Sequence, residues 1–197
     1  LAGCLRPATG FALPIVASPG GRGSVISLAL DKTLAGLGEE GYRLEAAPGR
    51  VSLVAPAPAG LFRAAQTLRQ LLPPEIFGDR PAAGVAWRVP GVRIEDRPRF
   101  RWRGLMLDTG HDFQRLPFIL RFIDLMALHK FNVFHWHISD LGTFPLEIRG
   151  YPRLQHADTL GKRLRGEPPR GVKPGRYSQE EAREVIAGAL EGLTELR

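Results

Sequence analysis

The feature that most constrains the fold is an apolar strand–helix–strand pattern in the second half of the chain. Trp102–Asp108 (WRGLMLD) and Phe131–Ile138 (FNVFHWHI) are almost continuously apolar, which is typical of strands that are buried on both faces. Between them, Pro117–His129 carries apolar residues at helical spacing, namely Phe118, Ile119, Phe122, Leu125, Met126 and Leu128. This order predicts a βαβ unit with parallel strands, and repeated units of this kind build parallel sheets or barrels.

Polar residues stand where each of these two strands ends. Asp108 closes the first strand, and His137 and Asp140 lie at the end of the second. In barrels built from βα units, the active site forms at the carboxyl ends of the strands. We therefore expect the candidate site at this end of the sheet.

The upstream residues predict a small α+β domain. The pattern indicates a short helix at Leu1–Gly10, strands at Ser24–Leu30, Tyr42–Ala46 and Arg50–Ala55, and a helix at Ala59–Leu72. The last two strands form a hairpin across a Pro-Gly turn, and two prolines end the helix. The polar segment Glu95–Arg99 contains a proline and marks a boundary, so we expect domains at residues 1–97 and 98–197.

The second domain is expected to be part of a barrel. After a Gly/Pro/Arg-rich loop at Leu154–Tyr177, Ser178 and Glu181 form a capping box that starts a helix reaching Arg197. A (β/α)8 TIM barrel needs eight strands and typically about 250 residues, whereas the pattern predicts two strands here. The predicted fold class is an α+β N-terminal domain followed by an incomplete α/β barrel, as in a truncated chain.

Composition narrows the possible partners. The formal net charge is +7, and Arg97–Arg103 interleaves arginines with Phe100 and Trp102. Nucleic-acid binding could use such a segment, but the alternation favours a strand with apolar side chains inward. The single cysteine, Cys4, rules out an internal disulfide, and no apolar run reaches the roughly 20 residues of a membrane helix. We expect neither nucleic acid nor a membrane as partner, and the sequence does not fix the oligomeric state.

Two segments of the second half resemble a known family. IEDRPRFRWRGLMLDTGHDF and HKFNVFHWHISDLGTFPLEI are similar to the opening of the catalytic barrel in family 20 glycoside hydrolases, the β-N-acetylhexosaminidases. The upstream segment EGYRLEAAPGRVSLVAPAPAGLFRAAQTLRQLLP resembles the small α+β domain that precedes that barrel. The resemblance extends over about residues 1–154, and its two strand motifs occur in the family's order and spacing.

The resemblance implies removal of terminal N-acetylglucosamine or N-acetylgalactosamine from glycans, without a metal or an organic cofactor. In the family a glutamic acid protonates the glycosidic oxygen, and the substrate's acetamido oxygen attacks the anomeric carbon, aided by a neighbouring aspartate. That Asp-Glu pair belongs at the end of the fourth strand, so we expect it downstream and expect this chain alone to be inactive. The family also suggests a secreted, periplasmic or lysosome-like location, although no signal peptide is visible.

Individual positions follow from the resemblance. Asp108 and His137 match residues at the sugar-binding end of the barrel, and Asp140 matches an aspartate that supports a histidine contacting the general acid. His111 stands where the family has an arginine that grips sugar hydroxyls, and Leu141 replaces a second aspartate. Both departures lie at the substrate-binding rim. At the first of them, histidine is shorter and offers fewer donors than arginine. The implied substrate-binding residues are Asp108, His111, His137 and Asp140.

Two other interpretations stay open. His135 and His137 point to the same face of a strand, and such a pair also occurs in metal-dependent TIM-barrel hydrolases. The small domain with a partial barrel could instead be a non-catalytic binding module. Trp102 and Trp136 lie in the apolar strands and are expected in the core rather than as sugar platforms.

Overall fold

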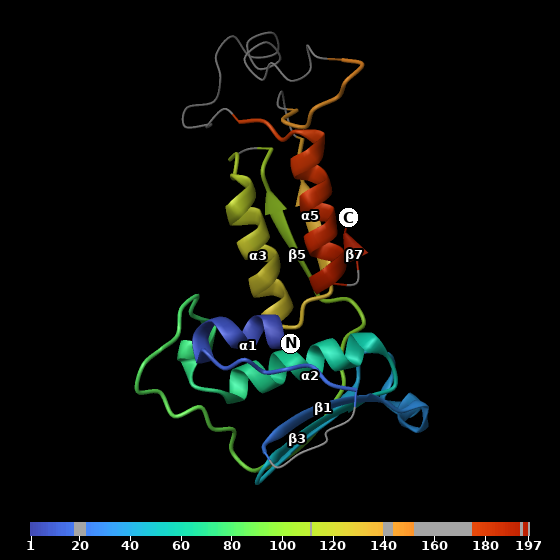
Figure 1. Cartoon of the computed structure of the whole chain (residues 1–197). Coiled ribbons are helices and arrows are strands. Elements are labelled where there is room, and N and C mark those ends of the chain that lie inside the picture. Colours follow the sequence, from blue (N-terminus) through green and yellow to red (C-terminus); the bar gives the residue numbers. More distant parts are fainter. Residues whose placement is uncertain (18–22, 111, 140–143, 152–174, 194, 197) are drawn as a thin grey trace. The chain divides into compact units, whose positions relative to one another are not determined.

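The chain folds into two compact units, Leu1–Arg99 and Phe100–Arg197. The computed structural model describes residues 1–17, 23–110, 112–139, 144–151, 175–193 and 195–196 (Figure 1). No helix in these ranges is long and apolar enough to cross a membrane.

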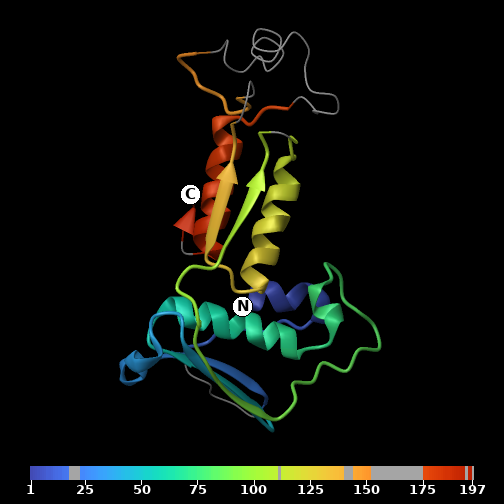
Figure 2. The same cartoon turned by 180° about the vertical axis from the view of Figure 1, so that it is seen from behind.

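The first unit is a mixed sheet with helices on one face (Figures 1 and 2). Its described strands follow the order β1 (Val25–Leu30), β3 (Arg50–Ala55), β2 (Tyr42–Ala47) and β4 (Val92–Asp96). β1 runs parallel to β3, and the other pairs are antiparallel. The helices are α1 (Ala2–Thr9) and α2 (Pro58–Leu71), with 3-10 turns η1 (Lys32–Leu37) and η2 (Pro74–Phe77). The short first helix, the strand at 24–30, the hairpin and the second helix predicted from the sequence are confirmed.

Alternation along the hairpin decides which side chains form the core of this unit. Leu44 and Leu53 are cross-strand partners, and both are fully buried against Ala64 and Leu68 of α2. Their neighbours Arg43 and Glu45 point to the opposite face, because successive side chains of a strand alternate. The sheet therefore has one apolar face under the helices and one charged face.

A buried tyrosine joins three elements of the first unit. The Tyr42 hydroxyl lies 2.6 Å from the Thr67 hydroxyl on α2 and donates to Asp96 Oδ2 on β4 at 2.8 Å. Tyr42 is 1% exposed, so these bonds are shielded from water. The contact fixes α2 and the edge strand β4 to the centre of the sheet.

The second unit is a parallel sheet whose helices cover one face (Figures 1 and 2). In chain order its described elements are β5 (Gly104–Asp108), α3 (Leu116–Leu128), β6 (Val133–His137), α5 (Gln179–Gly192) and β7 (Glu195–Leu196). β5 and β7 both pair with β6 in parallel. The βαβ unit predicted from the apolar pattern is confirmed.

The end of the chain differs from the sequence-based expectation. A helix reaching Arg197 was expected, but α5 ends at Gly192 and Leu193 is extended. Glu195 and Leu196 then pair with Val133 and Phe134. Glycine is a poor helix former, and the β6 backbone offers hydrogen-bonding groups that a following strand can satisfy. The described residues therefore contain a third parallel strand that the pattern did not predict.

The first apolar strand is shorter and more exposed than expected. Leu105 and Met106 are 38% and 56% exposed, because β5 is an edge strand and helices cover only one face of the sheet. On α3 the buried positions are Ile119, Ile123, Met126 and Ala127, whereas Phe118 and Leu125 of the predicted stripe are half-exposed. The helix is apolar on more than one face, so spacing alone could not select the buried one.

The basic aromatic segment before β5 does not form the predicted strand. Residues 97–103 are irregular, and both Phe100 and Trp102 are more than half exposed, so the expectation that Trp102 lies in the core is wrong. The cause lies in local polar contacts. Asn132 accepts from the Arg103 backbone N–H and donates to the Arg101 carbonyl, each at 2.9 Å, while the Arg103 guanidinium binds two further carbonyls. Side chains satisfy part of this backbone, and the Arg103 carbonyl accepts from the backbone N–H groups of Asn132 and Val133 at 2.9 and 3.3 Å.

Replacing Tyr42 with phenylalanine is expected to lower the free energy of unfolding by about 2 kcal/mol, because the variant loses a buried hydrogen bond to a carboxylate. Urea denaturation of the chain measures this change. Tyr151→Phe is the matched control, since the Tyr151 side chain is 68% exposed. Equal stability of the two variants would contradict the role assigned to the Tyr42 hydroxyl.

The capping box predicted at the start of α5 is confirmed. The Glu181 backbone N–H donates to Ser178 Oγ at 3.0 Å, and the Ser178 backbone N–H donates to Glu181 Oε2 at 2.9 Å. Ser178→Ala should cost about 1 kcal/mol of unfolding free energy, whereas Ser178→Asp should retain most of it, because aspartate also caps helices. Thermal unfolding compares the two variants, and a neutral alanine substitution would refute the contribution of the cap.

Candidate functional site

Two of the four expected site residues lie side by side at the carboxyl ends of neighbouring strands. Asp108 and His137 are register partners in the parallel pair β5–β6. Met106 and His135 are partners two residues earlier, so these four side chains share one face of the sheet. His111 and Asp140, the other two expected residues, lie outside the described residues.

Hydrogen bonds continue the pairing beyond the last strand residues. The Thr109 backbone N–H donates to the His137 carbonyl at 2.8 Å, and the Thr109 hydroxyl donates to the same oxygen at 3.3 Å. The Gly110 backbone N–H donates to Asp108 Oδ1 at 2.9 Å, which closes a tight turn at the end of β5. Asp108 and His137 therefore stand on backbone that is fixed on both strands.

The arrangement suits hydrogen bonding to a polar, uncharged ligand. The Asp108 carboxylate is an acceptor, and the His137 imidazole carries one donor and one acceptor when neutral. Both residues are half-buried, so they are open to solvent on one side. Adjacent hydroxyls of a sugar present the donors and acceptors that such a pair would recognise. We call Asp108 and His137 the rim pair.

The pair of histidines on β6 was the basis of the metal alternative. The rings of His135 and His137 do share a face, with centroids 6.0 Å apart. Among the residues that the structure describes, however, no group of three His, Cys, Asp or Glu side chains could hold a metal ion. Asp140 and His156, two residues of ligand type that follow the histidines in the sequence, lie outside that part of the chain.

The sequence did not identify Tyr177 as a site residue. Its side chain is fully buried, on the face of the sheet opposite to the rim pair. Its ring packs edge-on against Trp136 at 5.0 Å between centroids, and the Trp136 indole N–H donates to the Thr109 hydroxyl at 2.9 Å. Burial raises the pKa of the Tyr177 hydroxyl, an effect that hydrogen bonds with Thr109 and Gln114 partly oppose. The sequence feature that could have identified it is its position just before the helix cap Ser178, where an apolar residue often packs against the first turns of the helix.

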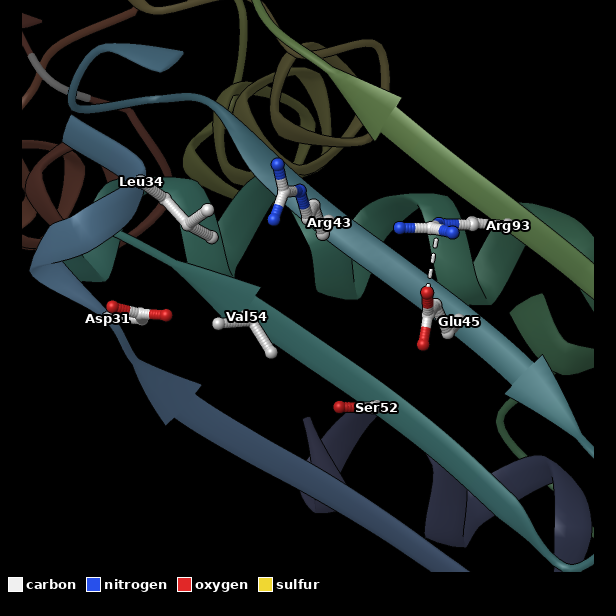
Figure 3. Close-up of a pocket in the computed structure, with 7 residues that line it drawn as sticks. All are labelled: Asp31, Leu34, Arg43, Glu45, Ser52, Val54 and Arg93. Carbon is white, nitrogen blue, oxygen red and sulfur yellow. Dashed lines mark ion pairs between the residues drawn. The ribbon is translucent and has the colours of Figure 1, made fainter. Parts of the chain in front are cut away.

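A depression lies on the charged face of the first unit's sheet (Figure 3). It is lined by Asp31, Leu34, Arg43, Glu45, Ser52, Val54 and Arg93. Arg93 pairs with Glu45 at 2.9 Å, and Arg43 pairs with Glu95 at 2.6 Å, with all four side chains exposed by two fifths or more. The pKa of Asp31 is lowered chiefly by hydrogen bonds from Thr33. These charges compensate one another, as on an ordinary solvated sheet face.

Comparisons with known proteins agree on one family. The model described as "Glycosyl hydrolase family 20, domain 2" matches residues 1–97, and "Glycosyl hydrolase family 20, catalytic domain" matches residues 100–193. A β-hexosaminidase of Porphyromonas gingivalis is 36% identical over 94% of this chain and 23% of its own length. A β-N-acetylhexosaminidase of Cellulomonas fimi is 34% identical over 88% of this chain and 32% of its own length.

Comparisons with solved structures point to the same family. The GH20 β-N-acetylhexosaminidase from Streptomyces coelicolor superimposes with a TM-score of 0.82 at 39% identity, covering 99% of this chain and 37% of that one. A mutant Streptomyces plicatus β-hexosaminidase in complex with the product GlcNAc gives the same values. The chain thus spans between 23% and 37% of the length of these relatives.

The buried hydroxyl of Tyr177 predicts a loss of stability in alkali. Because its pKa is higher in the folded chain than its ordinary value of 10.0, the unfolded chain releases the proton first. The free energy of unfolding should therefore fall as the pH rises above about 10. Urea unfolding at pH 8 and pH 10.5 should show a larger fall for the natural chain than for Tyr177→Phe. Tyr151→Phe, which removes an exposed hydroxyl, should behave like the natural chain, and identical falls in all three would contradict this assignment.

Proposed function

Because the chain belongs to glycosyl hydrolase family 20, we propose that it forms the substrate end of a β-N-acetylhexosaminidase, which removes terminal N-acetylhexosamine from glycans. In this proposal residues 1–97 form the small α+β domain and residues 98–197 form the opening of the (β/α)8 barrel, which the family-model matches at residues 1–97 and 100–193 support. The observation that carries the proposal is the rim pair, held side by side at the carboxyl ends of parallel strands. This is the end of a barrel at which active sites form.

The rim pair would bind the sugar and would not perform the chemistry. The Asp108 carboxylate can accept hydrogen bonds from sugar hydroxyls, and charge-assisted bonds of this kind are roughly twice as strong as neutral ones. The His137 imidazole would add a donor or an acceptor at the same edge. Asp140 and His111 are proposed to complete this rim, and Asp140 is proposed to support a histidine that contacts the general acid.

The proposed chemistry is substrate-assisted hydrolysis with retention of configuration. A glutamic acid with a raised pKa donates its proton to the glycosidic oxygen, which breaks the bond to the anomeric carbon. The acetamido oxygen of the same sugar forms the new bond to that carbon, and water later opens the cyclic intermediate. Both the glutamic acid and its aspartate neighbour are proposed to follow a fourth strand. The described strands of the second unit are β5, β6 and β7, so this chain alone should be inactive.

The intact product of the gene should hydrolyse an aryl N-acetyl-β-glucosaminide. It should leave the matching aryl β-glucoside intact, because that substrate lacks the acetamido group. Chain 1–197 on its own should release no aryl alcohol. An intact product without activity would contradict the proposed function, and cleavage of the plain glucoside would contradict the substrate-assisted mechanism. Turnover by chain 1–197 that is lost in Asp140→Ala would overturn the predicted inactivity.

Two substitutions at the rim pair test the sugar-binding role in the intact product. Asp108→Asn should lower kcat/KM about ten- to a hundredfold, since hydrogen bonds to a charged group contribute about 1.5–3 kcal/mol, and His137→Gln should lower it about two- to tenfold, since a neutral hydrogen bond contributes about 0.5–1.5 kcal/mol. Asp124→Asn and His129→Gln are matched controls, because both side chains are exposed on or next to α3, away from the strand ends. Rim variants that are as active as the controls would refute the role of the pair.

A further inference from the structure

Tyr177 is bonded to both segments that follow the rim strands. Its hydroxyl donates to the Gln114 carbonyl in the segment after β5, at 2.5 Å. Its backbone N–H donates to the Pro145 carbonyl at 2.8 Å, and its carbonyl accepts from the Glu147 backbone N–H at 2.9 Å. One residue, distant in sequence from both strands, therefore joins the segments at their carboxyl ends.

Residues 175–177 approach the rim strands through close packing. The Tyr177 ring lies 4.6 Å from the Phe113 ring, centroid to centroid. A Cβ added to Gly175 would come within about 2 Å of Phe113 ring atoms, so only glycine allows the chain to pass there. Such contact, with the Tyr177 side chain completely buried, leaves little room for another position of the ring.

The contacts continue from Tyr177 to the rim pair in two steps. Its ring packs on Trp136, and its hydroxyl group interacts with the Thr109 hydroxyl, which accepts from the Trp136 indole. Thr109 follows Asp108 directly and is bonded to the His137 carbonyl. Trp136 directly precedes His137. Tyr177 thus contacts Thr109 and Trp136, the chain neighbours of the two rim residues, from the opposite face of the sheet.

The hydrogen bonds of Tyr177 lie next to the ends of the rim strands, outside the apolar core of the second unit. The hydroxyl of Tyr177 has its hydrogen bonds at the rim, and the interior of the second unit already has Ile119, Ile123, Phe134 and Val185 in its apolar core. Polar groups in a buried network have defined geometry, because an unsatisfied member would cost about 1–3 kcal/mol. The hydroxyl therefore adds precision of placement to the packing of the ring.

We propose that Tyr177 is a positioning residue: through Trp136 and Thr109 it sets the placement of the Asp108 and His137 side chains that bind the substrate. The inference rests on the proposed function only for the statement that this rim binds a hexosamine. The contacts themselves predict the effect on His137 independently of any activity.

The first experiment uses the imidazole Cε1–Hε1 NMR signals of chain 1–197, assigned with single His→Gln variants. In Tyr177→Phe the His137 signal should shift or split, while the signal of His129, the C-cap residue of α3, should stay in place. Tyr151→Phe should change neither signal. If Tyr177→Phe does not fold, Thr109→Val removes the linking hydroxyl instead, and Thr109→Ser should restore the natural His137 signal. An unchanged His137 signal in the folded variants overturns the proposal.

The second experiment separates positioning from general stability in the intact gene product. Tyr177→Phe should raise KM for the aryl N-acetyl-β-glucosaminide about three- to tenfold and change kcat less, since the rim contacts hydroxyls that do not react. An unchanged KM in an active product overturns the proposal even if the His137 signal moves. If the natural product has no activity, the proposed function fails, and the NMR result alone decides the role of Tyr177.

Discussion

The parallel register of β5 and β6 is the constraint on which the candidate site depends. Parallel strands need a crossover to connect them, and α3 supplies it, so both strands end at the same edge of the sheet. The register pairs Asp108 with His137, and Thr109 extends the pairing by two bonds to the His137 carbonyl. A shift of either strand by one residue would turn one of the rim side chains to the helix-covered face. The proposed binding chemistry on one face therefore depends on packing on the other.

The helix-covered face contains the polar groups that fix this register. The indole of Trp136 and the hydroxyls of Thr109 and Tyr177 are buried, and each has a hydrogen-bond partner within the second unit. Buried polar groups favour one arrangement over its neighbours, because each alternative leaves a donor or acceptor unsatisfied. The first unit uses the same device at Tyr42, whose hydroxyl joins α2 to β4.

Elements with strong local periodicity could be predicted from the sequence, and contacts between distant segments could not. The hairpin, the βαβ unit and the Ser178 cap follow from alternation, helical spacing and capping chemistry, and all are confirmed. The pairing of Asp108 with His137 could be predicted only in part, because the sequence pattern identified the strand ends but not the register of the two strands. Tyr177 was assigned to a loop because its packing partners lie more than 30 residues away. Trp102 was wrongly predicted to lie in the core. The backbone around it is held by side-chain hydrogen bonds of Asn132 and Arg103, which produce no periodic pattern in the sequence.

A crystal structure of the intact gene product with N-acetylglucosamine bound tests the central claim most directly. In this complex the Asp108 carboxylate and the His137 imidazole should each lie within about 3 Å of a hydroxyl of the terminal sugar. The Thr109–His137 bonds and the Tyr177 contacts should be retained. A sugar bound elsewhere, with Asp108 and His137 beyond hydrogen-bond distance of it, would contradict the assignment of this rim as the substrate end of the site.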